Sequence, residues 1–365
     1  MKLHLFNPEH DIALAANLSN FTAPHAGRAL RADLGFLPAI WAEEGDAVLV
    51  DDIDDTKRRW ADCLIRNGLH FPEPTWVTLR DLHVLHPEQV DPWGWDLALR
   101  AQLLRNGIME DLLPAIDEIE EIRHLSHRQK AAGILQELQK IQGTTGEAFC
   151  CLSVDEIEEK WNHYHRIVLK APWSSSGRGV RFMEDTWNMP LQRWAEHVIQ
   201  TQGSIMVEPY YNKVEDFAME FFSDGLGRID YQGLSVFRTT HGAYTGNVLA
   251  AETDKQQMMS RYIPVSVLLE VQDNLCKLTA SLFQHRYVGP FGIDMMIVRD
   301  SVNGGYLLHP CVEINVRRTM GHVALALAKH ETGPRRLMRV ALSGRYELDV
   351  EIDDYEEHHH CNDAK

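Results

Sequence analysis

Apolar runs of strand length alternate with apolar residues at helical spacing along the first third of the chain. Residues 3–6 and 46–50 are short apolar runs, and the apolar positions after Asp11 recur at helical spacing. Further helical patterns cover residues 56–67, 93–106 and 114–124. Strands that alternate with helices are typical of an open α/β layer. We therefore predict such a layer for the first third of the chain.

The hydrophobic pattern after residue 125 contains more strand-like segments. Helices are predicted from a cap at Ser126 to Gly143, after the capping box at 153–156, and at 190–202, 265–284, 322–331 and 334–342. Apolar strand-like segments lie between them, at 166–172, 179–183, 204–211, 214–222 and 231–251. Residues 288–318 form two apolar strands joined by a turn at Asn303, Gly304 and Gly305. Helices and strands therefore both occur throughout the rest of the chain.

Composition and charge limit the kinds of molecule that we expect the protein to bind. The chain has 365 residues, 44% of them hydrophobic, and a formal net charge of −17. Acidic surfaces repel nucleic-acid backbones and anionic membranes, so we expect neither as a partner. No apolar run approaches the roughly 20 residues that span a bilayer, and the beginning, MKLHLFNPEHD, lacks the apolar run of a signal peptide. Six scattered cysteines do not form a disulfide framework, which predicts a reduced, cytoplasmic location.

A loop rich in small residues follows a buried strand that ends at Lys170. It carries Ser174 to Ser176, Gly177, Arg178 and Gly179 before a second strand begins. Small residues let backbone N–H groups approach an anion, and an arginine adds donors suited to phosphate oxygens. A hairpin with a polar tip is the alternative, and the two interpretations are about equally supported by this motif alone.

A linker between two later strands holds Glu208, Tyr210, Tyr211 and Glu215. Backbone N–H and C=O groups exposed in such a linker can bind the edge of a purine, and a carboxylate can accept hydrogen bonds from ribose hydroxyls. Taken alone, this segment is better explained as a hairpin that exposes two glutamates.

The two strands of 288–318 carry polar residues among apolar ones. Because side chains alternate along a strand, Glu313, Asn315 and Arg317 lie on one face, and Asp294 is on the partner strand. Two carboxylates and an amide oxygen form a hard oxygen site of the kind that Mg²⁺ uses when it bridges nucleotide phosphates. A salt-bridge network that includes Arg317 and Arg318 is the alternative.

In this order, the lysine strand with its Gly/Ser loop, the glutamate-bearing linker and the Asp…Glu-x-Asn-x-Arg strands resemble the ATP-grasp superfamily. The resemblance covers about residues 126–328. It implies a pre-ATP-grasp α/β domain (1–125) and two α+β subdomains, an N-terminal one with the phosphate-covering loop (126–205) and a C-terminal one with the Mg/ATP site (206–350). An acidic, His-rich tail (351–365), which we expect to be frayed, follows them.

The resemblance also implies roles for individual residues. The residues expected to bind ATP are Lys170, Ser176, Gly177, Arg178, Glu208, Tyr210, Tyr211 and Glu215. The expected metal ligands are Asp294, Glu313 and Asn315, and Arg317 is expected to stabilise the reacting anion. Many members of the superfamily carry Asp-Lys at the start of the helix that enters the fold. Here the segment is LSHRQKAA, so Arg128 or Lys130 takes that role.

The acceptor site is expected near the segment between the linker and the metal strands. This segment concentrates Arg238, His241, Tyr244 and Asn247, where Arg238 could hold a carboxylate and His241 could assist proton transfer; a surface hairpin is an equal alternative. Ligands of open α/β sheets commonly sit at the carboxyl ends of strands. Further substrate candidates are therefore Asn7 and Asp11 after the first strand, and Arg318 and His322 beside the metal strand.

By this resemblance the chain is expected to be an ADP-forming ligase. It would use ATP with one or two Mg²⁺ ions, for which Mn²⁺ could substitute, to activate a small carboxylic acid as an acylphosphate for an amine or thiol. A small-molecule kinase would need the same residues, and a nucleotide-binding module with little turnover is a third possibility. The chain could act as a homodimer.

Overall fold

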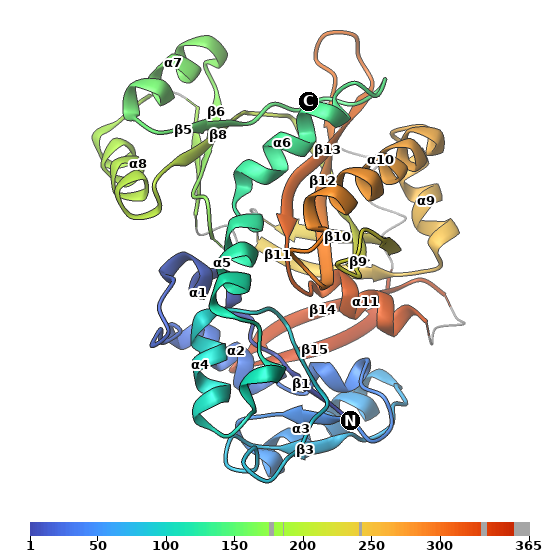
Figure 1. Cartoon of the computed structure of the whole chain (residues 1–365). Helices are drawn as coiled ribbons and strands as arrows, with labels where there is room; N and C mark the ends of the chain where they lie inside the picture. Colours follow the sequence, from blue (N-terminus) through green and yellow to red (C-terminus); the bar gives the residue numbers. More distant parts are fainter. Residues whose placement is uncertain (175–178, 185, 241–242, 330–333, 354–365) are drawn as a thin grey trace.

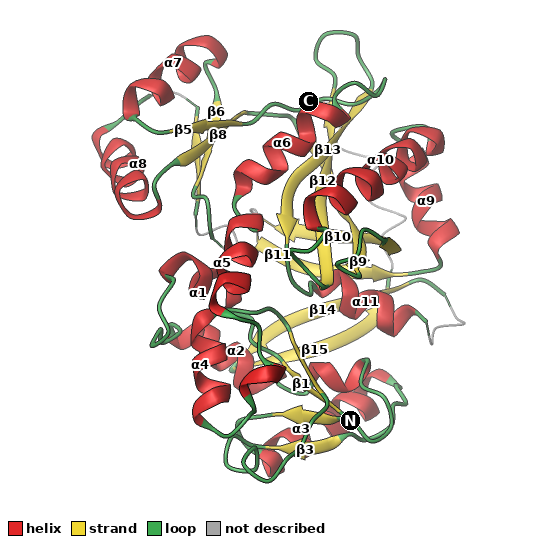
Figure 2. Ribbon diagram, in the orientation of Figure 1, coloured by secondary structure: helices red, strands yellow, loops and turns green. Residues whose placement is uncertain are grey.

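Three sheets organise the molecule in the computed structural model, which describes residues 1–174, 179–184, 186–240, 243–329 and 334–353 (Figures 1 and 2). One sheet is built from the N-terminal part of the chain, a small one from its middle, and a large one from its C-terminal part. Within these ranges, no helix is long and apolar enough to cross a membrane.

The N-terminal sheet is parallel throughout and has the strand order β3-β2-β1-β4. Its strands are β1 (Lys2–Leu5), β2 (Ala47–Leu49), β3 (Thr75–Val77) and β4 (Gln89–Pro92). The segments around them hold α1 (His10–Ala16), α2 (His25–Leu34), η1 (Leu37–Ile40), α3 (Ile53–Asn67), α4 (Leu97–Arg105), η2 (Glu110–Leu112) and α5 (Ile116–Leu125). The predicted open α/β layer is confirmed.

The small sheet is antiparallel, with the strand order β5-β8-β6-β7. It comprises β5 (Phe149–Cys151), β6 (Ile167–Lys170), β7 (Val180–Met183) and β8 (Ile205–Pro209), with α7 (Val154–Tyr164) and α8 (Met189–Gln202) packed on it. Ser153 caps α7 by accepting from the Glu156 backbone, as the capping-box motif predicts. The apolar side chains of this sheet and its helices form a separate core.

The large sheet has seven strands in the order β13-β12-β9-β10-β11-β14-β15. They are β9 (Lys213–Ser223), β10 (Ile229–Thr240), β11 (Ala243–Leu249), β12 (Gly289–Arg299), β13 (Tyr306–Asn315), β14 (Arg336–Ser343) and β15 (Arg345–Ile352). The helices of this part are α6 (Arg128–Leu138), α9 (Glu252–Ser260), α10 (Val265–Phe283) and α11 (Met320–Ala328). Apolar residues of α6 and α10 form one core with Phe217, Phe221 and Ile293 of the sheet.

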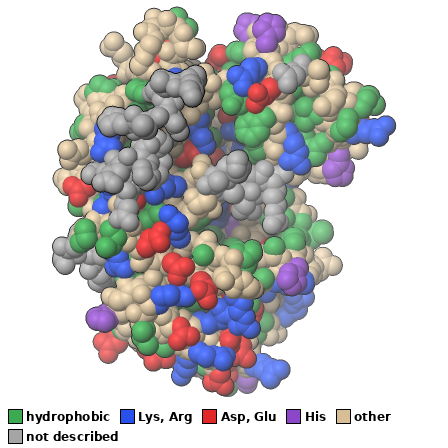
Figure 3. All heavy atoms as spheres, turned by 180° about the vertical axis from the view of Figure 1, so that it is seen from behind, with side chains coloured by type: hydrophobic (Ala, Val, Ile, Leu, Met, Phe, Trp, Pro, Cys, Tyr) green, Lys and Arg blue, Asp and Glu red, His purple; other side chains and the backbone are tan. Residues whose placement is uncertain are grey.

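The last two strands join the large sheet to the N-terminal part, since β15 packs against α2 and α3 (Figure 1). Met338 and Leu348 share a core with Phe6 and Trp60 of the N-terminal region. Ion pairs add to this junction at the surface, where Arg66 of α3 meets Glu347 and Asp349. On the back of the molecule, acidic and basic side chains are interspersed over its lower part (Figure 3).

Four expectations about local structure are wrong. The pattern predicts a helix over residues 334–342, but 336–343 form β14, because Leu337 and Met338 are buried in two different cores on opposite faces of a strand. The helix expected from 93 begins at Leu97, since Asp96 caps it. His127, not Ser126, caps α6, and Glu351 and Ile352 extend β15 rather than belong to a frayed end. Residues 354–365 of the tail lie outside the described residues.

Candidate active site

Three of the predicted metal ligands meet on one face of the large sheet. Asp294 of β12 lies directly opposite Glu313 of β13, and Gly292 lies opposite Asn315. Because side chains repeat every second residue, both pairs project from the same face of the sheet. The intervening Ile293 and Ile314 project from the other face into the core. The antiparallel register therefore brings together residues that are about 20 positions apart.

The electrostatics of this face favour a bound cation. Burial, followed by the charge of Glu313, raises the pKa of Asp294 to about 7, although a hydrogen bond from Asn315 acts in the opposite direction. Two carboxylates and an amide oxygen are hard donors of the type that Mg²⁺ prefers. Among the described residues no group of three or more His, Cys, Asp and Glu could hold a metal ion, so a metal site here would also need the amide oxygen of Asn315.

Arg128 links this face to the small sheet. Its guanidinium Nη2 donates to Glu313 Oε2 over 2.7 Å, while Nη1 donates to Ala171 O and Ser174 Oγ. The first residue of α6 therefore contacts both a predicted metal ligand and the beginning of the predicted phosphate-covering loop. Arg128, one of the two basic residues suggested by the sequence, thus lies between Ser174 and Glu313. The loop residues Ser176, Gly177 and Arg178 lie outside the described residues.

Lys170 and Glu208 form a buried ion pair on the small sheet. Lys170 Nζ donates to Glu208 Oε2 over 2.6 Å, and the two residues are 9% and 4% exposed. Lys170 lies opposite Met206, two residues before Glu208, so both side chains project from one face of the sheet. The structure thus places the predicted phosphate-binding lysine directly beside the first residue of the predicted adenine linker.

The other linker residues surround the same region. The Arg166 guanidinium stacks on Tyr210 at 3.9 Å, and Tyr211 meets the ring of His309 edge-on at 5.5 Å. Burial, and then the charge of Asp216, raises the pKa of Glu215 to about 7. A partly buried carboxyl group of this kind is suited to accept hydrogen bonds from hydroxyl groups of a ligand.

Sequence reasoning missed His309. It is fully buried on β13, and neither ring nitrogen has a hydrogen-bond partner among the described residues. Burial and the nearby charge of Lys170 lower its pKa to about 3, so the ring is neutral. The alternation of the strand contained the signal, since His309, Glu313 and Asn315 share one face.

Arg317 is held by Asp11 from the N-terminal part of the chain. Its Nε and Nη2 donate to the two Asp11 oxygens over 2.8 and 2.7 Å, and Nη2 also donates to Asn315 Oδ1 over 3.0 Å. Burial would raise the pKa of Asp11, but the charge of Arg317 and the hydrogen bonds from His10 and Arg317 together hold the pKa well below its usual range. Asp11, which was expected to bind substrate, is therefore placed to orient Arg317.

Arg318 and His322, the substrate candidates beside β13, contact other side chains of the protein. Arg318 pairs with Asp91 of β4 over 2.7 Å and lies 4.6 Å from the ring of Trp41. His322 Nδ1 lies 3.1 Å from the buried carboxyl group of Glu220, and burial lowers the pKa of His322 to about 3. Arg318 therefore contacts β4 of the N-terminal sheet, and His322 contacts β9 of the large sheet.

The predicted acceptor segment forms a network within the large sheet. The Tyr244 hydroxyl donates to Asn247 Oδ1, and Asn247 Nδ2 donates to Ser235 Oγ. Arg238 Nη2 donates to Asp353 Oδ1 at the end of the described chain. These contacts do not bring Arg238, Tyr244 and Asn247 to the metal ligands, and His241 lies outside the described residues.

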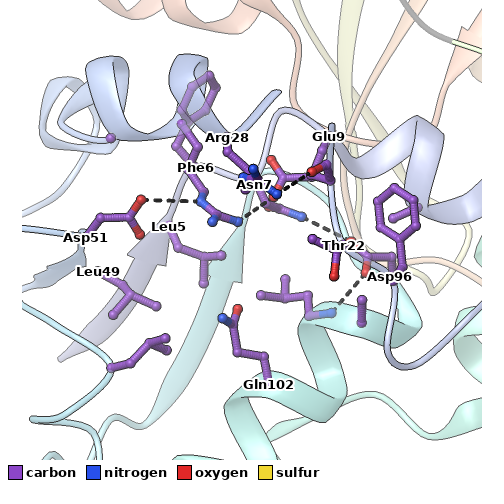
Figure 4. A pocket seen from close by; sticks show the side chains of 18 of the residues that line it. Leu5, Phe6, Asn7, Glu9, Thr22, Arg28, Leu49, Asp51, Asp96 and Gln102 are labelled. Carbon is purple, nitrogen blue, oxygen red and sulfur yellow. Dashed lines mark hydrogen bonds and ion pairs between the residues drawn. The ribbon is translucent and has the colours of Figure 1, made fainter. Parts of the chain in front are cut away.

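Asn7 lies at a separate cavity of about 420 Å³ in the N-terminal region (Figure 4). The cavity is bounded by the segments that follow β1, β2 and β4, together with α2 and α4. Asn7 Nδ2 donates to Gly94 O over 2.8 Å, which ties the loop after β1 to the loop after β4. The expectation of a ligand site at the carboxyl ends of these strands thus coincides with a cavity.

The chain is similar to several solved structures. A biotin carboxylase–β,γ-ATP complex from Campylobacter jejuni matches with a TM-score of 0.51 and 13% identity, over 93% of this chain and 75% of that chain. An N5-carboxyaminoimidazole synthetase from Staphylococcus aureus complexed with ADP matches with a TM-score of 0.48 and 12% identity, over 93% of this chain and 82% of that one. No protein-family model and no curated protein matches the sequence. At such identities the likeness concerns the fold alone, and it confirms the ATP-grasp fold expected from the sequence.

Proposed function

Because the chain has the ATP-grasp fold, we propose that it is an ATP- and Mg²⁺-dependent ligase that activates a small carboxylic acid as an acylphosphate for attack by an amine or thiol. The observation that carries this proposal is the convergence of Asp294, Glu313 and Asn315 on one sheet face. The Campylobacter jejuni biotin carboxylase of the same fold was crystallised as an ATP complex, which supports a nucleotide as the ligand.

The donor set fits a magnesium ion. Asp294 and Glu313 are opposite one another, and burial and the Glu313 charge raise the pKa of Asp294 to about 7. A divalent cation between them would remove the repulsion that opposes ionisation of both acids. Mg²⁺ bound by Asp294, Glu313 and Asn315 would neutralise charge on the phosphates of ATP.

The residues of the small sheet would hold the rest of the nucleotide. Lys170 lies beside Glu208, where its ammonium group could turn to a phosphate oxygen while remaining close to this carboxylate. Tyr211 and His309 would border the adenine, and Glu215 would accept hydrogen bonds from the ribose. Arg128 would bind phosphate oxygens from the side of α6, since it already contacts Glu313 and Ser174.

The reaction follows from where these charges lie. A carboxylate oxygen of the acid would attack the γ-phosphorus of ATP, and cleavage of the bond to the β,γ-bridging oxygen would release ADP. The amine nitrogen would then attack the acyl carbon, the C–O bond to phosphate would break, and the nitrogen would lose a proton to solvent. Arg317, which is held in place by Asp11, would stabilise negative charge at the reacting group. We also propose a cytoplasmic location, which the free thiols of the five described cysteines support.

The test is an ADP- and AMP-release assay with Mg-ATP and pairs of small carboxylic acids with amines or thiols. Release of ADP that requires one acid and one acceptor is the expected result. Glu313→Ala and Asp294→Asn should abolish this turnover. Glu137→Ala, which removes an exposed glutamate of α6, should leave it unchanged and serves as the matched control.

Other products would contradict the ligase. AMP as the product would exclude an acylphosphate mechanism. A stable phosphorylated product formed without a second substrate would assign a small-molecule kinase. ATP binding without turnover for any pair would leave a nucleotide-binding module.

A further inference from the structure

The cavity of the N-terminal sheet combines an apolar wall with charged groups at two depths. Its volume of about 420 Å³ falls within the roughly 300–1,000 Å³ of small-molecule sites. Leu5, Leu49 and Leu99 contribute to the apolar wall. Buried acids lie on one side, and exposed arginines lie at the rim. Figure 4 shows Glu9, Asp96 and Arg28 around this space.

One carboxylate oxygen of Glu9, in the wall of the cavity, lacks a hydrogen-bond partner among the described residues. It is 7% exposed, and its Oε1 accepts from Arg31 Nη1. Its Oε2 is buried and has no hydrogen-bond partner among the described residues. A buried carboxylate oxygen without a donor is costly, so a donor from a ligand would stabilise it.

A second buried acid lies close to Glu9. Asp96 is 3% exposed, caps α4 through its Oδ1, and accepts from Asn7 Nδ2. Burial raises the pKa of Glu9 and also that of Asp96, and the charge of Asp96 adds to the effect on Glu9. A cationic group placed between these two carboxyl groups would favour their ionised forms.

Basic side chains lie at the rim of the cavity, together with the exposed Asp51. Arg28 and Arg105 line the cavity from α2 and α4, and both side chains are exposed. Arg28 Nη1 donates to Ala23 O, which leaves its other N–H groups available to a ligand. Arg31 is engaged differently, because it lies between Glu9 and Asp51. An anionic group would therefore find donors at the rim, and a cationic group would find acceptors inside.

We propose that this cavity binds a small zwitterion of the amino-acid class, with its ammonium group against Glu9 and Asp96 and its carboxylate against Arg28. The apolar wall would receive the side chain. If the ligase function proposed above holds, this zwitterion is the amine substrate; that role rests on the proposed function, whereas the binding does not. Glu9 lies two residues before Asp11, which holds Arg317. The cavity is therefore close in sequence to a residue of the candidate active site.

Isothermal titration calorimetry without ATP tests the binding. The probes are the standard L-amino acids, their D-enantiomers and simple dipeptides, each titrated into the whole chain. Every ligand that binds is compared with its N-acetyl derivative, which lacks the ammonium group, and with its amide, which lacks the carboxylate. We expect both derivatives to bind at least about tenfold more weakly.

Two substitutions locate the ligand in the cavity. Glu9→Gln should weaken the binding of the zwitterion at least about tenfold, and Arg28→Gln should do the same from the exposed rim, where folding is not at risk. Arg58→Gln, at an exposed arginine of α3, is the matched control and should not change it. Retained thermal unfolding transitions show that the variants are folded.

Two results would overturn the proposal. One is that no zwitterion of the panel binds to the folded wild-type protein. The other is that a zwitterion binds equally well to wild type, Glu9→Gln and Arg28→Gln. The assay of the proposed ligase is independent, because ADP release can fail while the calorimetric titration still shows a cavity-bound zwitterion.

Discussion

The carboxylate of Asp11 and the guanidinium of Arg317 form two parallel hydrogen bonds between residues 306 positions apart. Asp11 lies in the first turn of α1, the helix after the first strand, and Arg317 follows the strand that carries Glu313 and Asn315. Planar, bidentate pairing fixes the orientation of an arginine as well as its charge. The N-terminal α/β region therefore sets the position of a side chain in the candidate active site.

Replacing Asp11 with Asn should lower both stability and turnover. Removal of one member of a buried ion pair costs roughly 3–5 kcal/mol, because the other charge remains buried without a partner. Urea unfolding at pH 7 measures this loss. Because the pKa of Asp11 is lowered in the folded state, its contribution is present above the usual Asp pKa and is lost as the pH falls through the lowered one.

The control for this substitution is Asp273→Asn. Asp273 is an exposed residue of α10, and surface changes of this kind alter stability by about 0.5 kcal/mol or less. If Asp11→Asn proves no more destabilising than Asp273→Asn, the pair does not hold Arg317 in the way described.

The raised pKa of Glu220 predicts that the stability of the protein depends on pH. Burial raises the pKa of this carboxyl group to about 8, with a further contribution from Asp294. The folded state then binds a proton that the unfolded state has released, so the free energy of unfolding falls as the pH rises from the usual Glu pKa to about 8. The slope from one such group approaches about 1.4 kcal/mol per pH unit.

Glu220→Gln isolates this contribution. The amide is similar in shape to the protonated acid, so we expect little change below the usual Glu pKa and a variant that becomes increasingly more stable than wild type as the pH rises to 9. Urea unfolding of both proteins across this range gives the difference. Parallel pH profiles for the two proteins would show that Glu220 is ionised in the folded state.

Gly321 leaves room for the carboxyl group of Glu220. A Cβ atom added at Gly321 would overlap Glu220 Oε1 and would also approach Ser235 Oγ. Gly321→Ala should therefore destabilise the protein by roughly 1–3 kcal/mol, the usual cost of overpacking a core. Thermal or urea unfolding measures the effect.

Gly133 provides a matched control for that change. It lies in α6, is exposed, and a Cβ atom there would have open space around it. Gly133→Ala should stabilise the protein by about 0.5–1 kcal/mol, because alanine favours helix interiors. Effects of equal sign at both positions would contradict the packing described around Glu220.

Lys170→Met should weaken ADP and ATP binding by roughly 1.5–3 kcal/mol, the contribution of a charge-assisted hydrogen bond. The long apolar side chain of methionine retains most of the packing, so the effect reports the ammonium group. Calorimetric titration of ADP with Mg²⁺ measures it. Lys140→Met, at an exposed lysine of the segment after α6, is the control, and equal affinities for the two variants would remove Lys170 from the nucleotide site.

His309→Leu separates a structural role from a ligand-binding role. Both ring nitrogens are buried without partners among the described residues, so their removal should leave the protein at least as stable in urea. If the ring borders the adenine, ADP affinity should fall at the same time. A variant with lower stability and unchanged ADP affinity would show that His309 serves the fold alone.

The metal strands are largely predictable because their signal is local. The alternation of polar and apolar residues is enough to place Glu313, Asn315 and Arg317 on one face. The same rule places His309 on that face as well. The strand β14 is not predictable in this way, since Leu337 and Met338 are buried on opposite faces and the alternation is lost.

The sequence by itself determined most of the helices, the open α/β layer of the first third and the polar face of β13, because periodicity and turn chemistry are properties of neighbouring residues. Only the tertiary structure decided that Asp11 binds Arg317, that Arg128 contacts Glu313, and that Glu9 and Asp96 share a cavity. These relationships join segments far apart in the chain. Their geometry depends on how the sheets pack against each other, which no local pattern of residues encodes.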